Sequence, residues 1–277
     1  MAELLPAGDK IAEYDARVDP DAPAEKQKEI AEQRKRKHGI LGRFSLVQLH
    51  VITLVVVLSA SGVVPAEDLA FVVLTSIYMF LMKSLVFKAP VSSGPPPNVM
   101  ANNQYVMGKY LLFASFVGLV IPVGYVLGAF VYGDQKALKS ASPHLFLFAC
   151  QILSENVAFG GNRVSLPIRA LIPIFYNTRR LFTLVTWLKT DLNKGLESVG
   201  QHGTGMPLTA AQWILFGRAL AGFNLVLWSY NLFFFLLPVY LPRAFKKHYE
   251  MEAATTALDS KNKAGETAAG ETKKKTT

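Results

Sequence analysis

Several long blocks of the chain are apolar and almost free of charge, and they constrain the fold more than any other feature. Each block runs over roughly 17–25 residues, the length that a helix needs to cross about 30 Å of hydrocarbon. A soluble domain would instead alternate apolar and polar residues at the period of a helix or a strand. The sequence therefore predicts an all-α, polytopic membrane protein that is surrounded by a lipid bilayer.

About six hydrophobic helical segments of this kind lie between two polar ends. They cover residues 45–64, 66–87, 108–131, 143–159, 163–189 and 211–241. We expect a helical membrane domain over residues 44–242, between a polar, basic-ended N-terminal tail (1–43) and a basic C-terminal tail (243–277). The tails contain few large apolar residues to bury, so we predict that they are disordered.

The segment of residues 163–189 allows two interpretations. It is largely apolar at both ends, but Arg179 and Arg180 stand near its middle. Two central arginines cost about 5–7 kcal/mol on the insertion scale, roughly what the apolar flanks gain. Held by its neighbours, the segment would cross and give six spans. Lying in the interface on one apolar face, it would leave five spans and an in-plane helix.

The placement of basic residues favours six spans. One cluster precedes the first block, at residues 34–37 and Arg43, and another follows the last block at Arg243, Lys246 and Lys247. Such clusters favour the cytosolic leaflet, where anionic lipid headgroups attract them. Both termini are then cytosolic, which requires an even number of spans. The polar N-terminus does not have the pattern of a signal peptide.

The C-terminal sequence suggests an address within the cell. Lys274 and Lys275 occupy the fourth and third positions from the end, where they resemble the dilysine retrieval signal of endoplasmic reticulum membrane proteins. Like other C-terminal signals, this is an address rather than an anchor. We therefore expect the endoplasmic reticulum or another endomembrane. The alternative is a lysine-rich tail that only improves solubility.

Polar residues within the apolar blocks are the best candidates for a functional site. They form one candidate intramembrane polar cluster: Gln151, Glu155, Asn156, Asn177, Arg179 and Arg180. A carboxylate in lipid needs a partner, which the arginines offer. The cluster could bind an anionic substrate or a lipid headgroup. The alternative is a salt bridge that only fixes two helices against each other.

Small and amide residues predict close contacts between helices. Gly124 and Gly128 share a helix face and permit close approach, and Gly217 and Ala221 form a similar pair. Asn224 and Asn231 are spaced for hydrogen bonds to a neighbouring helix. Such contacts suit association with other membrane proteins or with a second copy of the chain.

Features of catalysis are not evident in the sequence. We find no arrangement of nucleophile and base, no phosphate-binding loop and no metal-ligand spacing, so we expect no catalytic residues, metal or cofactor. The basic runs come without a nucleic-acid-binding motif or aromatic platform, which argues against nucleic acid as a partner.

Three runs carry a resemblance to a known family: SLPIR at 165–169, PIFYNTRR at 173–180 and LLPVYLPRAFKK at 236–247. They resemble a plant family of multi-pass membrane proteins known only as a domain of unknown function. The likeness covers about residues 41–249 and implies a helical membrane protein without an assigned activity.

Two functions of different classes fit these observations. The first is a non-enzymatic scaffold or membrane-organising protein of the endomembrane system, because the loops are short and no catalytic set is evident. The second is a small transporter or channel that uses the Glu/Arg cluster.

Overall fold

The computed structural model describes residues 46–87, 99, 104–159, 164–195 and 209–274. Within these ranges all regular structure is helical, as expected. The chain divides into two compact units, Met1–Thr53 and Leu54–Thr277, and of the first unit only the beginning of one helix is described. The N-terminal tail and Lys275 lie outside the described residues.

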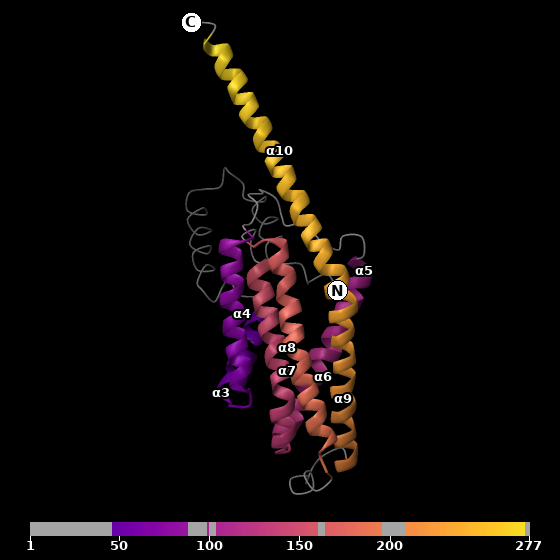
Figure 1. Cartoon of the computed structure of the whole chain (residues 1–277). Coiled ribbons are helices and arrows are strands. Elements are labelled where there is room, and N and C mark those ends of the chain that lie inside the picture. The colour runs from indigo at the N-terminus through magenta and orange to yellow at the C-terminus, as the bar shows by residue number, and fades with distance from the viewer. Residues whose placement is uncertain (1–45, 88–98, 100–103, 160–163, 196–208, 275–277) are drawn as a thin grey trace, which may run out of the picture. The chain divides into compact units, whose positions relative to one another are not determined.

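The described residues form six continuous helices (Figure 1). Two of them join α-helical and π-helical stretches without a break. The elements are α3 (Leu46–Ala60), α4 (Ala66–Leu85), α5 (Gln104–Ser115) with η3 (Phe116–Val120) and α6 (Ile121–Val131), α7 (Gln135–Phe159), α8 (Leu166–Leu192), and α9 (Ala210–Tyr230) with η5 (Asn231–Tyr240) and α10 (Leu241–Lys274).

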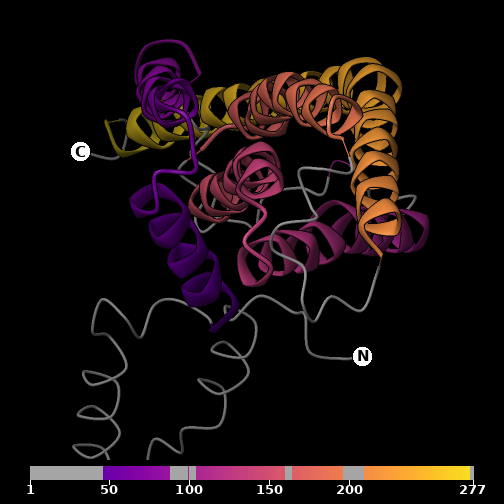
Figure 2. The same cartoon turned by 90° about the horizontal axis from the view of Figure 1, so that it is seen from below.

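Helix α7 is the central helix of the second unit. Every residue from 140 to 150 is buried, and a helix that is buried all round must have neighbours on all sides. It packs against α4, α6 and most extensively α8. Figure 2 shows the same arrangement along the bundle, with α7 between α8 and α6.

The start of α7 corrects the sequence-based boundary. The sequence predicted a loop up to residue 142, whereas α7 begins at Gln135 and contains Pro143. Gly133 supplies the turn with a φ of 72°, and the Asp134 carboxylate accepts a hydrogen bond from the Ala137 backbone N–H at 3.1 Å. This side-chain cap satisfies one of the free N–H groups at a helix start.

Pro122 explains the π-helical turn η3. A proline has no N–H, so the carbonyls four and five residues before it, Gly118 and Val117, lose a partner. His144 Nε2 contacts the Gly118 oxygen at 2.8 Å, and Asn224 Nδ2 donates to the Val117 oxygen at 3.2 Å. Side chains from α7 and α9 thus replace the missing backbone bonds inside the bundle, where backbone polar groups need a partner.

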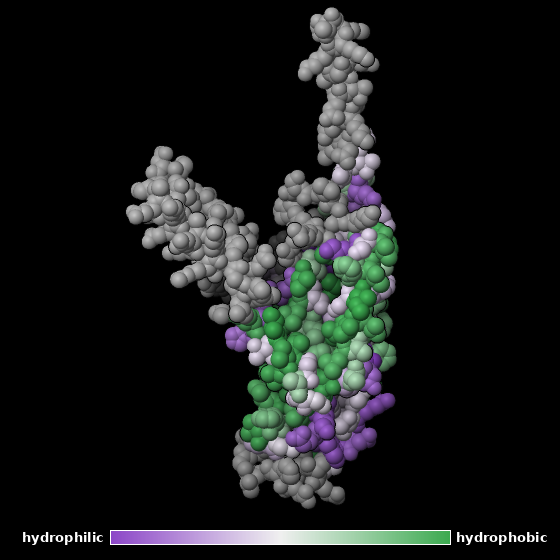
Figure 3. Space-filling model, turned by 90° about the vertical axis from the view of Figure 1, so that its left-hand side faces the viewer, coloured by the Kyte–Doolittle hydropathy of each residue, from purple (hydrophilic) through white to green (hydrophobic). Residues whose placement is uncertain are grey.

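The outer surface is apolar over much of its area. Figure 3 shows one face on which hydrophobic residues form a broad band. Large exposed apolar side chains lie on α4, α6 and η5, among them Val73, Leu74, Ile77, Phe80, Leu127, Phe130, Phe233 and Phe234. Soluble monomers rarely expose a broad contiguous apolar surface of this kind.

Three helices of the described part are long and apolar enough to cross a membrane. They are Ala66–Leu85, Tyr105–Val131 and Ala210–Ala257, while the apolar helix Gln48–Ala60 is shorter. Helices α7 and α8 carry more charged and polar residues, which lowers their hydropathy. The predicted number of six spans therefore remains a prediction.

The C-terminal tail differs from its prediction. Disorder was expected over residues 243–277, but α10 continues as a helix to Lys274. The segment is rich in alanine, glutamate and lysine, which have high intrinsic helix propensity. Local propensity favours a helix here although the residues have little apolar surface to bury.

A matched pair of glycine substitutions tests the packing of this fold. A Cβ on Gly118 would lie 2.5 Å from Trp228 Cζ2, whereas a Cβ on Gly124 would have no atom within 4 Å. We expect Gly118→Ala to destabilise the protein by about 1–3 kcal/mol through overpacking. Gly124→Ala should leave stability unchanged or raise it by up to ~1 kcal/mol through helix propensity. Thermal unfolding in detergent measures both, and equal effects would contradict the packing.

Candidate functional site

Arg180, on α8, lies at the centre of the polar groups inside the bundle. Its side chain is fully buried. The guanidinium carbon lies 4.6 Å from the ring centroid of Phe148 on α7 and 4.4 Å from that of Trp228 on α9. Stacking on aromatic faces is favourable for a guanidinium, and here it ties α8 to both neighbours.

A hydrogen-bonded relay connects Arg180 with Glu155. Arg180 Nη2 donates to Gln151 Oε1, and Gln151 Nε2 donates to Glu155 Oε1 at 2.8 Å. Gln151 and Glu155 are four residues apart on α7 and share one face, as the sequence suggested. The amide can do this because it accepts at one end and donates at the other.

Several buried polar atoms around Arg180 have no hydrogen-bond partner among the described residues. They are Arg180 Nε and Nη1, Asn177 Oδ1 and His144 Nδ1. Because the Gly118 carbonyl can only accept, His144 Nε2 must carry the proton, and Nδ1 is then an acceptor. Donors and acceptors without partners are costly in a buried site, so this region has unused capacity to bind polar groups.

A cavity of about 400 Å³ reaches one end of the relay. Gln151 and Glu155 line it, together with Tyr110 from α5, Asn231 from η5 and Tyr240 from η5. Its other walls are mostly apolar. Arg180 is not among the lining residues, because Phe148, Gln151 and Trp228 lie between it and the cavity. The cavity therefore exposes the carboxyl group and keeps the guanidinium covered.

The structure brings together only part of the candidate intramembrane polar cluster. Asn177 joins it, since its Nδ2 donates to the Trp228 backbone oxygen at 3.1 Å. Arg179 points elsewhere and donates from Nε to Asp68 Oδ1 on α4 at 2.7 Å. Asn156 is half-buried at the next position after Glu155. Neighbours in sequence are about 100° apart on a helix, which is why Arg179 and Arg180 face different helices.

The Arg179–Asp68 ion pair has a smaller cavity of its own, of about 280 Å³. Lys139, Glu67 and Thr183 are among its lining residues. Asp68 is buried and Arg179 half-buried. The pair connects α4 with α8, so the carboxylate that Arg179 binds is that of Asp68 and not that of Glu155. The sequence offered no local signal for it, because 111 residues separate the partners.

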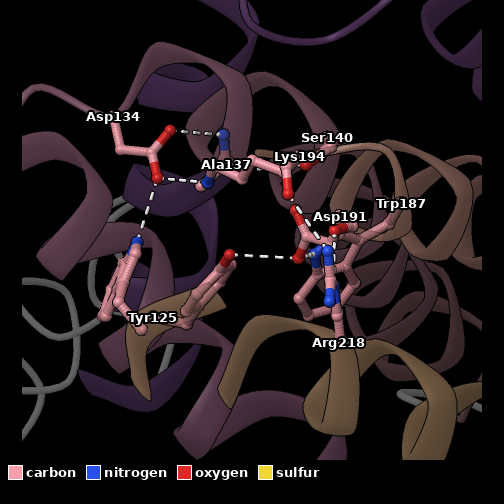
Figure 4. A network of polar contacts seen from close by, with 9 residues as sticks. Tyr125, Asp134, Ala137, Ser140, Trp187, Asp191, Lys194 and Arg218 are labelled. Atoms are coloured by element: carbon pink, nitrogen blue, oxygen red, sulfur yellow. Dashed lines mark hydrogen bonds and ion pairs between the residues drawn. The ribbon is translucent and has the colours of Figure 1, made fainter. Parts of the chain in front are cut away.

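A second polar network lies where α6, α7, α8 and α9 end or begin, and sequence reasoning missed it (Figure 4). Asp134 accepts hydrogen bonds from Lys194 and from Trp213 Nε1, the latter at 2.9 Å. Asp191 accepts from Tyr125 Oη at 3.1 Å and from Trp187 Nε1 at 2.9 Å. At this end of the bundle two carboxylates thus accept hydrogen bonds from the O–H or N–H groups of large aromatic side chains.

Arg218 completes this network by binding the C-terminal end of α8. Its Nε donates to the Asp191 backbone oxygen at 2.8 Å, and its Nη2 donates to the oxygens of Leu192 and Lys194, both at 3.0 Å. The last carbonyls of a helix lack intrahelical partners and carry partial negative charge. One arginine therefore fixes the end of α8 to α9.

The candidate helix-packing residues are placed as follows. A Cβ on Gly128 would lie 2.9 Å from Trp213, and one on Gly217 would lie 2.4 Å from Tyr125 Oη and 2.5 Å from Asp191 Oδ2, while Gly124 has open space. Ala221 is fully buried. Asn224 Oδ1 accepts from Trp228 Nε1 at 3.2 Å, and Asn231 lines the 400 Å³ cavity. Gly124 therefore makes no close approach, unlike Gly128 and Gly217.

The candidate retrieval signal lies at the edge of the described residues. Lys274 is the last residue of α10, and Lys275 falls outside. Asp134, which pairs with Lys194, stands in the turn between α6 and α7. Burial by itself would raise the pKa of Asp134, but hydrogen bonds from Lys194, the Ala137 backbone and Trp213 bring it below the usual 3.8.

Comparison with known proteins identifies one similarity. A family model described as "Domain of unknown function (DUF7733)" matches residues 43–249. No curated protein and no solved structure matches the chain. The match confirms the expected resemblance to a family of unknown function over nearly the same residues. A plant origin and a multi-pass family remain predictions.

Removing the Asp134 charge tests the second network. Asp134→Asn would remove the ion-pair partner of Lys194, whose side chain is fully buried, and leave it with the electrostatic attraction of Asp191, at a cost of up to about 3–5 kcal/mol. We expect a large fall in the unfolding temperature in detergent, and a partial recovery when Lys194→Met is added. Recovery would fail if the hydrogen bonds from Trp213 and Ala137 mattered more than the ion pair.

The same pair predicts a pH dependence. Because the folded pKa of Asp134 lies below its unfolded value, the pair stabilises the fold above about pH 4 and loses its effect as the pH falls through the folded pKa. The stability of Asp134→Asn should accordingly fall less on acidification than that of the unchanged protein.

Proposed function

We propose, for a chain that belongs to the DUF7733 family of unknown function, that it is a multi-pass integral membrane protein which acts by binding and organising other molecules rather than by catalysis. One observation carries the proposal: charged and amide side chains such as Arg180, Asp191 and Asn224 are fully buried inside the helices, while large apolar side chains cover the outside. This distribution suits a protein in lipid and is unfavourable in water.

Packing supports six crossings rather than five with an in-plane helix. Helix α8 has buried residues on several faces, among them Asn177, Arg180, Leu184 and Trp187, and it packs against α7 and α9. A helix in the interface would keep one polar face in water. With six crossings the basic clusters at both ends of the membrane domain lie on one side, which we take as the cytosol, where anionic headgroups would bind them.

A role without catalysis is supported by how the polar groups are used. The Arg179–Asp68 and Lys194–Asp134 pairs each join two different elements, and Arg218 fixes a helix end. These contacts hold the helices in fixed positions. A rigid helical domain with an apolar exterior suits a scaffold that organises membrane proteins, or further copies of itself, in the endomembrane system.

A small transporter is the second candidate, and the cavity at Glu155 is the observation in its favour. The buried Arg180 weighs against it. A transported anion would need the guanidinium, which two aromatic rings and Gln151 cover. We therefore place the scaffold first.

Cysteine labelling distinguishes the two topologies. In a variant in which Cys150 is replaced by alanine, we would introduce single cysteines at Ser61, Asn193 or Lys246, all exposed. Six crossings predict that a membrane-impermeant maleimide reaches Ser61→Cys and Asn193→Cys from the lumenal side and Lys246→Cys from the cytosolic side. An in-plane α8 would exchange the sides of Asn193→Cys and Lys246→Cys and leave Ser61→Cys unchanged.

The proposed retrieval signal has its own test. Replacing Lys274 and Lys275 by serine should release an N-terminally tagged protein from the endoplasmic reticulum to later compartments, because the receptor reads both ammonium groups near a free carboxyl terminus. Replacing Lys261 and Lys263, which are also in the tail, serves as the matched control and should not change the distribution. Identical distributions of all forms, seen by microscopy, would refute the signal.

A further inference from the structure

We propose that the 400 Å³ cavity between α5, α7 and η5 binds a neutral amphipathic lipid with a hydroxyl headgroup, which donates a hydrogen bond to Glu155. The inference rests on the proposed membrane location, because such a ligand reaches the site from the bilayer. The volume lies within the roughly 300–1,000 Å³ range of small-molecule sites. Like those sites, the cavity combines mainly apolar walls with a few polar groups.

The polar groups of the cavity suit a hydroxyl. Gln151 is the donor to Glu155 Oε1, and a carboxylate can accept about four hydrogen bonds, so Glu155 has capacity for a ligand donor. Tyr110, also lining the cavity, has a buried hydroxyl without a partner among the described residues. A ligand hydroxyl can donate to the carboxylate and accept from the tyrosine, using both.

The charge balance argues for a neutral headgroup. Gln151 connects Glu155 to Arg180, so the carboxylate and the guanidinium largely offset each other. An anion would meet the carboxylate first, because Arg180 is covered. A cation would compete with Arg180 for the same carboxylate. A neutral donor adds a hydrogen bond and leaves this balance unchanged.

The remaining walls suit an apolar body. Their residues come mainly from α5, α7 and η5: Met107, Leu111, Ala114, Ile152, Phe235 and Leu236. The π-helical segment η5 supplies Asn231, Phe235, Leu236 and Tyr240 to the cavity. π-Helical geometry is rare in proteins, and where it occurs it is often found at functional sites. This is a second reason to place a ligand here.

Photocrosslinking in phosphatidylcholine nanodiscs tests the proposal. The probes are a diacylglycerol and a sterol, each with a diazirine in its apolar part, because both present a neutral hydroxyl. A phosphatidic acid with the same diazirine is the anionic comparison. We expect one of the neutral probes to label peptides of α5 or η5 saturably. Which of them does so identifies the source of the hydroxyl.

Two leucines give a matched control. Leu111 and Leu112 are both exposed residues of α5, but only Leu111 lines the cavity. Leu111→Trp should reduce labelling at least fivefold, whereas Leu112→Trp should leave it unchanged within about twofold. Glu155→Gln should raise the half-saturating probe concentration by about tenfold, since hydrogen bonds to charged groups are stronger than those to neutral ones.

Three outcomes would overturn the site: labelling spread over the outer surface, equal labelling in the two tryptophan variants, or stronger labelling by phosphatidic acid. Thermal unfolding of each variant shows whether it is folded. The proposed membrane location is judged separately, by whether the unchanged protein needs detergent to stay monomeric. A protein that needs detergent but fails to bind either neutral probe would refute only the ligand.

Discussion

Arg180 imposes the constraint on which the arrangement of the bundle depends. A guanidinium keeps its charge in almost any environment, and it stands near the middle of α8 in a protein with an apolar exterior. It must therefore face other helices. Phe148 and Trp228 supply the rings, and Gln151 supplies the acceptor. These residues come from α7 and α9, so one side chain connects α8 to two of its neighbouring helices.

The same requirement applies to the backbone. Pro122 leaves carbonyls in η3 without their usual donors, and His144 and Asn224 occupy the positions that satisfy them. Asn224 also accepts from Trp228, whose ring stacks on Arg180. The π-helical turn η3 and the buried Arg180 are thus linked through the hydrogen bond between Asn224 and Trp228. Gly118 belongs to this set as well, because its missing side chain gives space to the Trp228 ring.

Local patterns in the sequence predicted the helices but only part of the site. Apolar blocks located each helix, although α7 begins earlier than its block and the last helix continues beyond residue 241 to Lys274. The four-residue spacing of Gln151 and Glu155 placed them on one face. The pairs Arg179–Asp68 and Lys194–Asp134 could not be predicted, because their partners are 111 and 60 residues apart and many acids and bases are available. The start of α7 at Gln135, before Pro143, was also missed, since tertiary packing outweighs the local effect of a proline.

The adjacent residues Arg179 and Arg180 bind different helices and have different roles. Arg179 and Arg180 have the same chemistry, yet the turn of the helix directs one to a carboxylate on α4 and the other to an amide on α7. Asp68 satisfies Arg179 directly, which leaves that pair as a connection between helices. Arg180 reaches Glu155 only through Gln151, so the carboxylate is partly balanced and still able to accept. The indirect contact, rather than the ion pair, is what makes a binding site possible.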